Sequence, residues 1–359
     1  MRKYLILITF LMASCGCADH SQMPQWRWGE KEKPEIEPEE TGWPLPASLG
    51  WTDVSQEFLG SAQGLIHVYK SPETINGVKT VAYLAVGSIV QVDWDVAAID
   101  DPAIRGTQDE LKTPAEWYRQ TAAPIVLNGG YFFAEGGKRY NASVAVSGGR
   151  TYGVNINYAS LDWETMYYPT RGVFYQQQTY AASPSEAFPK TGWTYWTGGQ
   201  KHYLYSVPAA NDWSADPLPV PDAHFPGEAA DFAPVTAIGG GPVLIHGGKI
   251  VNTWKEELLY GDGADDKMPE ARHPRTAIGV TGEGMLLLFV CEGRGMTEGV
   301  AGMTFAEEAA VLQQFGCTEA LNLDGGGSSC LLVNGRETIQ PSDGAQRPVA
   351  SVVTMKVKP

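Results

Sequence analysis

The sequence has few basic residues for its length. It contains 26 Lys and Arg against 41 Asp and Glu, which gives a formal net charge of −15 at pH 7. Nucleic-acid binding depends on clustered Lys and Arg that neutralise phosphates. This deficit therefore argues against a nucleic-acid partner.

Several catalytic and metal-binding motifs are also absent. No Gly-x-x-x-x-Gly-Lys-Ser/Thr occurs, which excludes a nucleotide P-loop. No Gly-x-Ser-x-Gly elbow occurs, so Ser328 is a poor candidate for a hydrolase nucleophile although it follows three glycines. The six histidines lack zinc-type spacing, and Asp262, Asp265 and Asp266 do not match an EF-hand. We therefore assign no metal ligand and no cofactor.

Cysteine is scarce and long apolar runs are missing. Cys15 and Cys17 lie in the N-terminal segment, which leaves Cys291, Cys317 and Cys330. These three have no metal-type spacing; they allow one disulfide and require none.

The N-terminus has the form of an export signal. Two basic residues precede an apolar run over residues 5–12, which is too short to span a bilayer. The following Ala-Ser-Cys resembles a bacterial lipobox. We therefore predict a lipoprotein signal peptide over residues 1–14 and a lipid anchor on Cys15, with an ordinary secreted protein as the alternative. Either outcome makes the protein an exported one, and the anchor would place it in the periplasm or at the cell surface.

The composition favours β-structure. With 41 Gly and 24 Pro, the chain has many turn residues, which indicates many short strands and few helices. Residues 15–50 are acidic and proline-bearing, which is typical of a stalk or linker. We expect one α+β domain over residues 51–359, with mixed or antiparallel sheets around a cleft.

The middle of the chain carries no motif that we can assign. Residues 150–233 are rich in Tyr, Trp, Pro and Gln, and we interpret them as an insertion that walls the cleft. Trp163, Trp193, Trp196 and Trp213 could stack on sugar faces, although local packing is the favoured explanation.

One stretch near the C-terminus looks like a site. Leu321 and Leu323 alternate with Asn322 and Asp324, which predicts a short strand ending in a carboxylate, and three glycines follow at once. Glycines allow sharp turns and close approach of a ligand to the backbone. A hairpin turn without chemistry is the alternative.

The flanking segments support a shared cleft. A capping box from Thr304 to Glu307 predicts a helix through roughly Phe315. The run over 123–132 is a second apolar strand that ends in Asn128 and glycines, with the same layout as the Asp324 stretch. Further strands are expected in the following ranges: 64–70, 78–86, 285–290, 330–333 and 349–355.

Three arginines stand at the ends of expected strands. Arg275, Arg294 and Arg347 lie in glycine-containing stretches or beside an expected strand. A guanidinium group binds phosphate oxygens with two parallel hydrogen bonds, so this set suits an anionic substrate. For each arginine taken alone, a surface salt bridge remains the alternative.

Five separated motifs together resemble the phosphodiester glycosidase family. In chain order they are Asn128-Gly129-Gly130-Tyr131-Phe132, Arg275-Thr276-Ala277-Ile278-Gly279, Gly302-Met303-Thr304 with Glu307, Leu321 to Ser329, and Arg347-Pro348-Val349. The resemblance runs from about Val81 to the end of the chain. Two features depart from the shared pattern, namely the aromatic middle and Cys330, which stands where a small polar residue is common.

The resemblance implies hydrolysis of a sugar-1-phosphodiester at the glycosidic carbon, with release of a sugar such as N-acetylglucosamine from a phosphorylated glycan. In that reaction Asp324 would stabilise the oxocarbenium-like centre or deliver water to it. Glu307 is either the partner carboxylate or only a helix cap. The implied substrate-binding residues are Asn128, Gly129, Arg275, Arg294, Asn322, Gly325, Gly326, Gly327, Ser328 and Arg347.

Two other functions stay open from the sequence. A non-catalytic glycan-binding surface lipoprotein would keep the fold and use the aromatic middle for capture. A metal-dependent phosphodiesterase would cut the P–O bond instead.

Overall fold

The computed structural model describes residues 46–60, 64–106, 109–177, 188–199, 201–260 and 269–359. All of these belong to one compact unit that spans Trp43–Pro359. The predicted signal peptide, the predicted stalk up to residue 45 and the Asp262, Asp265 and Asp266 loop lie outside the described residues. The described chain opens with a short 3₁₀ helix, η2 (Pro46–Leu49).

The predicted β-rich α+β fold is confirmed. Every strand pairing among the described residues is antiparallel, and the strands form three large sheets and two small hairpins. The described α-helices are short: α1 (Ser55–Leu59), α2 (Pro102–Arg105), α3 (Pro114–Thr121) and α4 (Phe305–Gln314).

The largest sheet has eight strands and carries the predicted site stretch. Its order is β1 (Thr52–Asp53), β2 (Ile66–Lys70), β5 (Ala82–Ser88), β20 (Met285–Cys291), β19 (Arg275–Thr281), β21 (Cys317–Asn322), β17 (Val243–His246) and β18 (Lys249–Ile250). Strand β21 pairs with β19 on one side and with β17 on the other. The chain that leads to Asp324 is therefore held in the interior of a sheet.

Both faces of this sheet are buried, and the alternation of side chains shows how. Along β20, Leu286, Leu288 and Val290 belong to the main hydrophobic core, while Leu287 and Phe289 belong to a second core on the opposite face. Side chains of a strand point alternately to its two faces, so a strand apolar at every position must be covered on both sides.

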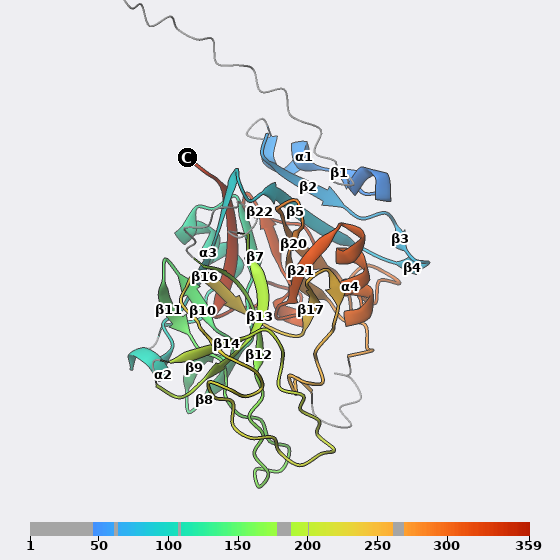
Figure 1. The fold of residues 1–359 in the computed structure, drawn as a ribbon. Coiled ribbons are helices and arrows are strands. Elements are labelled where there is room, and N and C mark those ends of the chain that lie inside the picture. The colour runs from blue at the N-terminus through green and yellow to red at the C-terminus, as the bar shows by residue number, and fades with distance from the viewer. Residues whose placement is uncertain (1–45, 61–63, 107–108, 178–187, 200, 261–268) are drawn as a thin grey trace, which may run out of the picture. The chain divides into compact units, whose positions relative to one another are not determined.

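Helix α4 provides that cover beside β21 and β17 (Figure 1). Thr304 caps its first turn, and the predicted capping box with Glu307 is present. Phe305, Ala309 and Leu312 are fully buried in the second core. Each such burial contributes about 1.5–3 kcal/mol for a large side chain, which fixes the helix on the sheet.

A five-stranded sheet packs on the main core. Its order is β23 (Arg336–Glu337), β22 (Leu331–Val333), β7 (Ile125–Asn128), β24 (Ser351–Val357) and β6 (Val92–Ala98). Ile125 and Leu127 of β7 face the main core, whereas Val126 faces a third core that includes Trp117 of α3. The predicted strand over 123–132 is thus two strands, because β8 (Phe132–Glu135) turns away to pair with β9 (Lys138–Asn141).

The aromatic middle supplies much of the third sheet. Its order is β11 (Arg150–Gly153), β10 (Ala145–Ser147), β16 (Pro234–Gly239), β12 (Arg171–Gln177), β13 (Lys190–Trp196), β14 (His202–Tyr205) and β15 (Ala230–Asp231). Trp193 is buried and donates its indole N–H to Thr253, whereas Trp163 is 79% exposed. Residues 150–233 therefore include core strands as well as surface loops.

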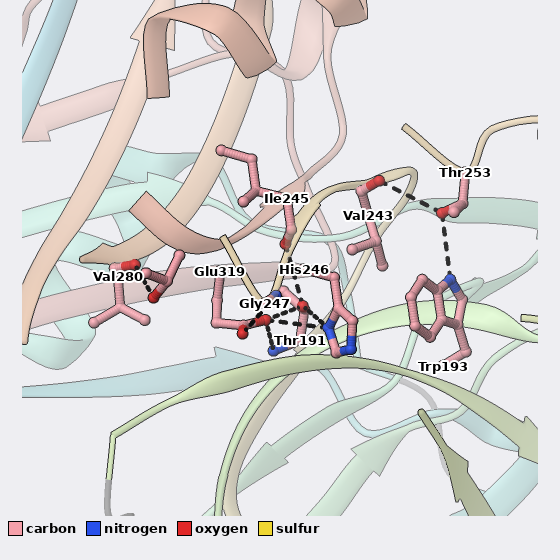
Figure 2. Close-up of polar contacts among 10 residues, drawn as sticks. Thr191, Trp193, Val243, Ile245, His246, Gly247, Thr253, Val280 and Glu319 are labelled. Carbon is pink, nitrogen blue, oxygen red and sulfur yellow. Dashed lines mark hydrogen bonds and ion pairs between the residues drawn. The ribbon is translucent and has the colours of Figure 1, made fainter. Parts of the chain in front are cut away.

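A polar cluster links this third sheet to the eight-stranded sheet. Figure 2 shows that Glu319 of β21, Thr191 of β13 and His246 of β17 contact one another through their side chains. The Glu319 carboxylate accepts from the backbone N–H of Thr191 at 3.1 Å and of Gly247 at 3.0 Å, and it also binds the Thr191 hydroxyl. Burial alone would raise the pKa of Glu319, but hydrogen bonds from His246, Thr191 and Gly247 lower it.

The region of the two strands expected over residues 64–70 and 78–86 has an extra element. Strand β2 pairs with β5, and a small hairpin of β3 (Thr74–Ile75) and β4 (Val78–Lys79) lies between them in the chain. Its turn is formed by Asn76 and Gly77, and both residues have positive φ. Cys291, Cys317 and Cys330 are buried and free. Within the described ranges, no helix is both long enough and apolar enough to cross a membrane.

Candidate active site

The Asp324 stretch leaves β21 and turns sharply between two neighbouring segments. The backbone N–H of Leu323 donates to Thr276 of β19 at 2.7 Å, and that of Asp324 donates to Gly129, just after β7, at 3.0 Å. The chain then forms a 3₁₀ turn, η5 (Gly326–Ser328). Asp324 is thus fixed where the eight-stranded and five-stranded sheets meet.

Asp324 lines a cavity of about 260 Å³ together with the glycine turn and three arginines. The full set of described lining residues is Tyr131, Tyr260, His273, Arg275, Arg294, Asp324, Gly325, Gly326, Gly327 and Arg347. The sequence predicted six of these as catalytic or substrate-binding beside Asp324, and segments far apart in the chain bring them together. Asp324 is the one carboxylate in this set of described lining residues.

The glycine turn is closely packed against the arginines. A Cβ on Gly327 would lie 2.2 Å from Nη2 of Arg347 and 2.2 Å from Oδ2 of Asp343. Gly326 has φ of +60°, and a Cβ there would lie 2.9 Å from Nη2 of Arg294. A side chain at either position would therefore have to displace the ends of these flexible side chains, and at Gly326 the positive φ also favours glycine.

Arg294 and Arg347 share a carboxylate. Asp343 accepts from Nε and Nη2 of Arg347 at 2.9 and 2.6 Å, and its other oxygen lies 3.9 Å from Nη1 of Arg294. Both arginine side chains keep about two fifths of their surface exposed, 44% for Arg294 and 39% for Arg347. They remain accessible to a ligand, and Asp343 restricts their orientation.

Arg275 is held more firmly. Its Nε donates to the carbonyl of Met303 at 2.9 Å, Nη2 donates to that of Ala271 at 3.0 Å, and the guanidinium carbon lies 3.9 Å from the centroid of Phe305. Burial raises the pKa of nearby Glu308 to about 8 although the charge of Arg275 lowers it, so Glu308 is mainly neutral at pH 7. The Arg275 charge at the cavity is thus not cancelled by that carboxyl.

Burial also changes the titration of Asp324. Removal from water raises the pKa of its carboxyl to about 6, against the hydrogen bond from Ser328, the charge of Arg347 and the N–H of Gly325. A carboxylate with a pKa nearer to 7 is a better proton acceptor than an ordinary aspartate. Ser328 is itself buried, and its hydroxyl also lies 3.4 Å from Nη1 of Arg347.

Asn128 and Gly129 are not among the described residues that line the cavity, so their positions do not support the predicted role in substrate binding. Asn128 is fully buried; its Oδ1 accepts from Thr276 Oγ1 at 2.9 Å and from the N–H of Cys330 at 3.0 Å, and its Nδ2 donates to the carbonyl of Asp324 at 2.6 Å. Gly129 is buried against Ser351. Both residues position the Asp324 turn.

Asn322 is likewise structural. It is 1% exposed, and its Nδ2 donates to the carbonyls of Gly241 and Leu323 at 2.6 and 2.7 Å and to the Tyr131 hydroxyl at 3.2 Å. The prediction that it binds substrate therefore does not fit its burial. It fixes the end of β21 and the ring of Tyr131 instead.

Glu307 has the structural role that the sequence left open. One carboxylate oxygen accepts from the N–H of Thr304 at 2.9 Å, and the other pairs with Arg272. Glu307 lines a separate small cavity beside Asn76 and Val311 rather than the cavity of Asp324. The prediction of a catalytic partner carboxylate is thus not supported by its position.

Tyr131, Tyr260 and His273 are lining residues that the sequence analysis did not select. Tyr131 belongs to the motif that begins at Asn128, so the sequence contained a signal that could have identified it. Its hydroxyl donates to the carbonyl of Gly241 at 2.6 Å. Tyr260 interacts with Tyr131 and Arg275, and it belongs to no motif. Asp343 has no sequence signal either.

Known proteins resemble this chain in sequence. The family model described as phosphodiester glycosidase matches residues 122–356. Over 84 residues, 23% of this chain, the sequence is 36% identical to the SPbeta prophage-derived uncharacterized protein YomE of Bacillus subtilis. It is 39% identical, over 84 residues and again 23% of this chain, to mouse N-acetylglucosamine-1-phosphodiester alpha-N-acetylglucosaminidase. The aligned part covers only 13% and 16% of those two relatives.

Solved structures show the same fold. The catalytic domain of zebrafish N-acetylglucosamine-1-phosphodiester alpha-N-acetylglucosaminidase, auto-inhibited by its pro-peptide, has a TM-score of 0.53 and 17% identity and covers 83% of this chain and 85% of its own. A hypothetical protein from Synechocystis has a TM-score of 0.50 and 18% identity, covering 83% of this chain and 65% of its own. Because the family model matches residues 122–356, which is more than half of the chain, the chain belongs to the phosphodiester glycosidase family.

Proposed function

We propose that this protein hydrolyses the glycosidic bond of a sugar-1-phosphodiester and releases the free sugar from a phosphorylated glycan. The observation that carries the proposal is the cavity in which Asp324 lies beside Arg275, Arg294 and Arg347. Three guanidinium groups in a chain of net charge −15 form a local cationic site, which suits a phosphodiester.

Water supplies the oxygen that forms the new bond to the anomeric carbon. The bond between that carbon and the phosphate oxygen breaks, and its electron pair leaves with the phosphate monoester. The arginines stabilise this departing charge, so the leaving oxygen needs little protonation. Ionised Asp324 either accepts the proton of the attacking water or stabilises the positive charge that develops at the anomeric carbon.

The test uses an N-acetylglucosamine-1-phosphodiester in ¹⁸O-labelled water. Wild-type protein is expected to release N-acetylglucosamine together with a phosphate monoester that carries no ¹⁸O, because the C–O bond is cut and water adds to the sugar. Asp324→Asn is expected to lower kcat by roughly 10²- to 10⁴-fold while the protein stays folded. Label in the phosphate would instead show P–O cleavage, the alternative phosphodiesterase reaction.

A non-catalytic glycan-binding protein is the second candidate, and the 79% exposed Trp163 favours it. Binding of sugar phosphodiesters without release of sugar, over a broad panel of sugars, would support that function and count against hydrolysis. If the protein only binds glycans, the variant Trp163→Ala, which removes the exposed ring, should weaken glycan binding. If the enzyme proposal is correct, the same variant should leave hydrolysis intact.

A further inference from the structure

A second cavity adjoins the one that contains Asp324. Its volume is about 190 Å³, and its described lining residues are Tyr131, Ala142, Ser143, Ile156, Arg171, Gly240, Leu259 and Tyr260. Tyr131 and Tyr260 line both cavities, so the two cavities are neighbours. The walls are mainly apolar and aromatic, and Arg171 is the one charged residue among the described lining residues.

Arg171 has no ion-pair partner among the residues that the structure describes. One of its terminal nitrogens, Nη1, donates to the backbone carbonyl of Glu257. The carboxylate of Glu257 is engaged elsewhere, because it accepts from the N–H of Gly172 at 2.8 Å, from that of Val243 at 2.9 Å and from the hydroxyl of Thr253 at 2.6 Å. Burial lowers the pKa of Arg171, yet an arginine side chain stays protonated in proteins.

The charge of Glu257 does act on Arg171, but the oxygens of that carboxylate already accept three hydrogen bonds, so the partly buried guanidinium group still gains from an anionic ligand. Arg171 contributes one positive charge to an otherwise uncharged set of described lining residues. One positive charge matches a carboxylate better than a dianionic phosphate monoester. A guanidinium group also matches the two oxygens of a carboxylate in geometry. The cavity is smaller than the roughly 300–1,000 Å³ typical of whole small-molecule sites, so it suits one substituent of a larger ligand.

We infer that this second cavity is a subsite for a carboxylate on the sugar of the substrate, and that Arg171 binds it. The inference rests on the proposed function for its kinetic test, because the sugar would bridge the two cavities past Tyr131 and Tyr260. It assigns the substrate to the class of acidic sugars, such as hexuronates.

The kinetic test compares two donors that differ only at carbon 6: glucuronic acid 1-(phenyl phosphate) and glucose 1-(phenyl phosphate), each as both anomers. Wild type is expected to have the higher kcat/KM on the uronate. In Arg171→Met, the ratio of kcat/KM for uronate over glucose should fall at least about tenfold, mainly through KM, which corresponds to about 1.4 kcal/mol. Arg171→Lys, which keeps the charge, should lose less.

The matched control is Arg336→Met, which removes an exposed arginine that pairs with Glu57 outside both cavities. Its donor ratio should equal that of wild type. An unchanged ratio in Arg171→Met, or equal loss on both donors, would overturn the inference, and a greater loss on glucose 6-phosphate 1-(phenyl phosphate) than on the uronate would assign phosphate instead. Thermal unfolding of each variant is measured in parallel, and if Arg171→Met does not fold, the donor ratio of Arg171→Lys decides.

Calorimetric titration with free glucuronate separates this inference from the proposed function. Wild type should bind glucuronate more tightly than glucose, and Arg171→Met should lose this difference. If wild type hydrolyses neither donor, the proposed function fails while this binding difference still supports the subsite. Absence of glucuronate binding to wild type would overturn the subsite.

Discussion

The side-chain amide of Asn128 donates a hydrogen bond to the backbone carbonyl of Asp324 at 2.6 Å across 196 positions of sequence. The other end of the same side chain accepts from Thr276 and from the N–H of Cys330. One buried amide thereby joins β7, β19 and the segment after the glycine turn. The position of the Asp324 carboxyl thus depends on a residue that does not line its cavity.

Asn128→Asp should lower both activity and stability. The new carboxylate lacks the N–H donor and would face the carbonyl oxygen of Asp324 in a fully buried place. We expect the free energy of unfolding to fall by about 2–5 kcal/mol and kcat to fall on the order of 10²-fold, because a small displacement of a catalytic group is costly. Urea denaturation and steady-state hydrolysis measure the two effects.

The matched control is Asn334→Asp. The Asn334 amide also donates to a backbone carbonyl, that of Phe58 at 3.1 Å, but it lies outside the cavity of Asp324. This variant should lose some stability and keep its kcat. If the two variants had equal kcat, Asn128 would not position the catalytic turn.

The sequence predicted the parts of the site that local pattern determines. The alternation of Leu321 and Leu323 with polar residues placed Asp324 at a strand end, and the capping box placed the start of α4 at Thr304. The β-rich fold followed from the glycine and proline content. These features depend on neighbouring residues, so a single sequence contains them.

The predicted binding residues that the structure places outside the cavity share one sequence pattern. Asn128 and Asn322 are polar residues at strand ends, and that pattern is the same for a ligand-binding side chain and for one that satisfies buried backbone groups. Only the three-dimensional arrangement shows that both are almost fully buried. Tyr260 and Arg171 belong to no local motif, because long-range pairing of strands brings them to the cavities.

Glu307→Gln should leave hydrolysis nearly unchanged. Glutamine at this position still completes the capping box with Thr304, and the lost pair with Arg272 is partly exposed and worth about 0–1 kcal/mol. We expect kcat and KM within about threefold of wild type. Thr304→Ala, which removes the cap and costs about 1 kcal/mol, shows what a purely structural loss does to kcat. A hundredfold fall in kcat for folded Glu307→Gln would restore Glu307 as a catalytic residue.

Asp343→Asn should weaken substrate binding more than catalysis. Asp343 restrains Arg347 and Arg294 at the surface of the cavity, and its loss frees both guanidinium groups. Because exposed pairs of this kind contribute about 0.5–1 kcal/mol, we expect KM to rise roughly three- to fivefold and stability to change little. Asp100→Asn, which breaks a comparable pair with Arg150, should leave KM unchanged. A fall in KM would show instead that Asp343 competes with the phosphate.

The pKa of Asp324 predicts how both stability and activity depend on pH. Its folded value of about 6 lies above the ordinary value of 3.8, so the folded state binds more protons than the unfolded state between these values. Wild-type stability therefore falls as pH rises through this window, and the cost is fully present above pH 6. Asp324→Asn lacks this cost, so its free energy of unfolding relative to wild type should increase by about 1–2 kcal/mol between pH 4 and pH 7. For the same reason, kcat/KM of wild type should decline below about pH 6, where Asp324 becomes neutral.

Asp212→Asn is the control of opposite sign. A hydrogen bond from Lys255 holds the pKa of Asp212 below its ordinary value, so this aspartate favours folding above pH 4 and loses that effect in acid. Its asparagine variant should therefore lose stability relative to wild type as pH rises from 3 to 7, measured by urea denaturation in the same buffers. If Asp324→Asn behaved like Asp212→Asn, the carboxyl of Asp324 would be stabilised in its charged form, and the proposed acid limb of activity near pH 6 would have to arise from another group.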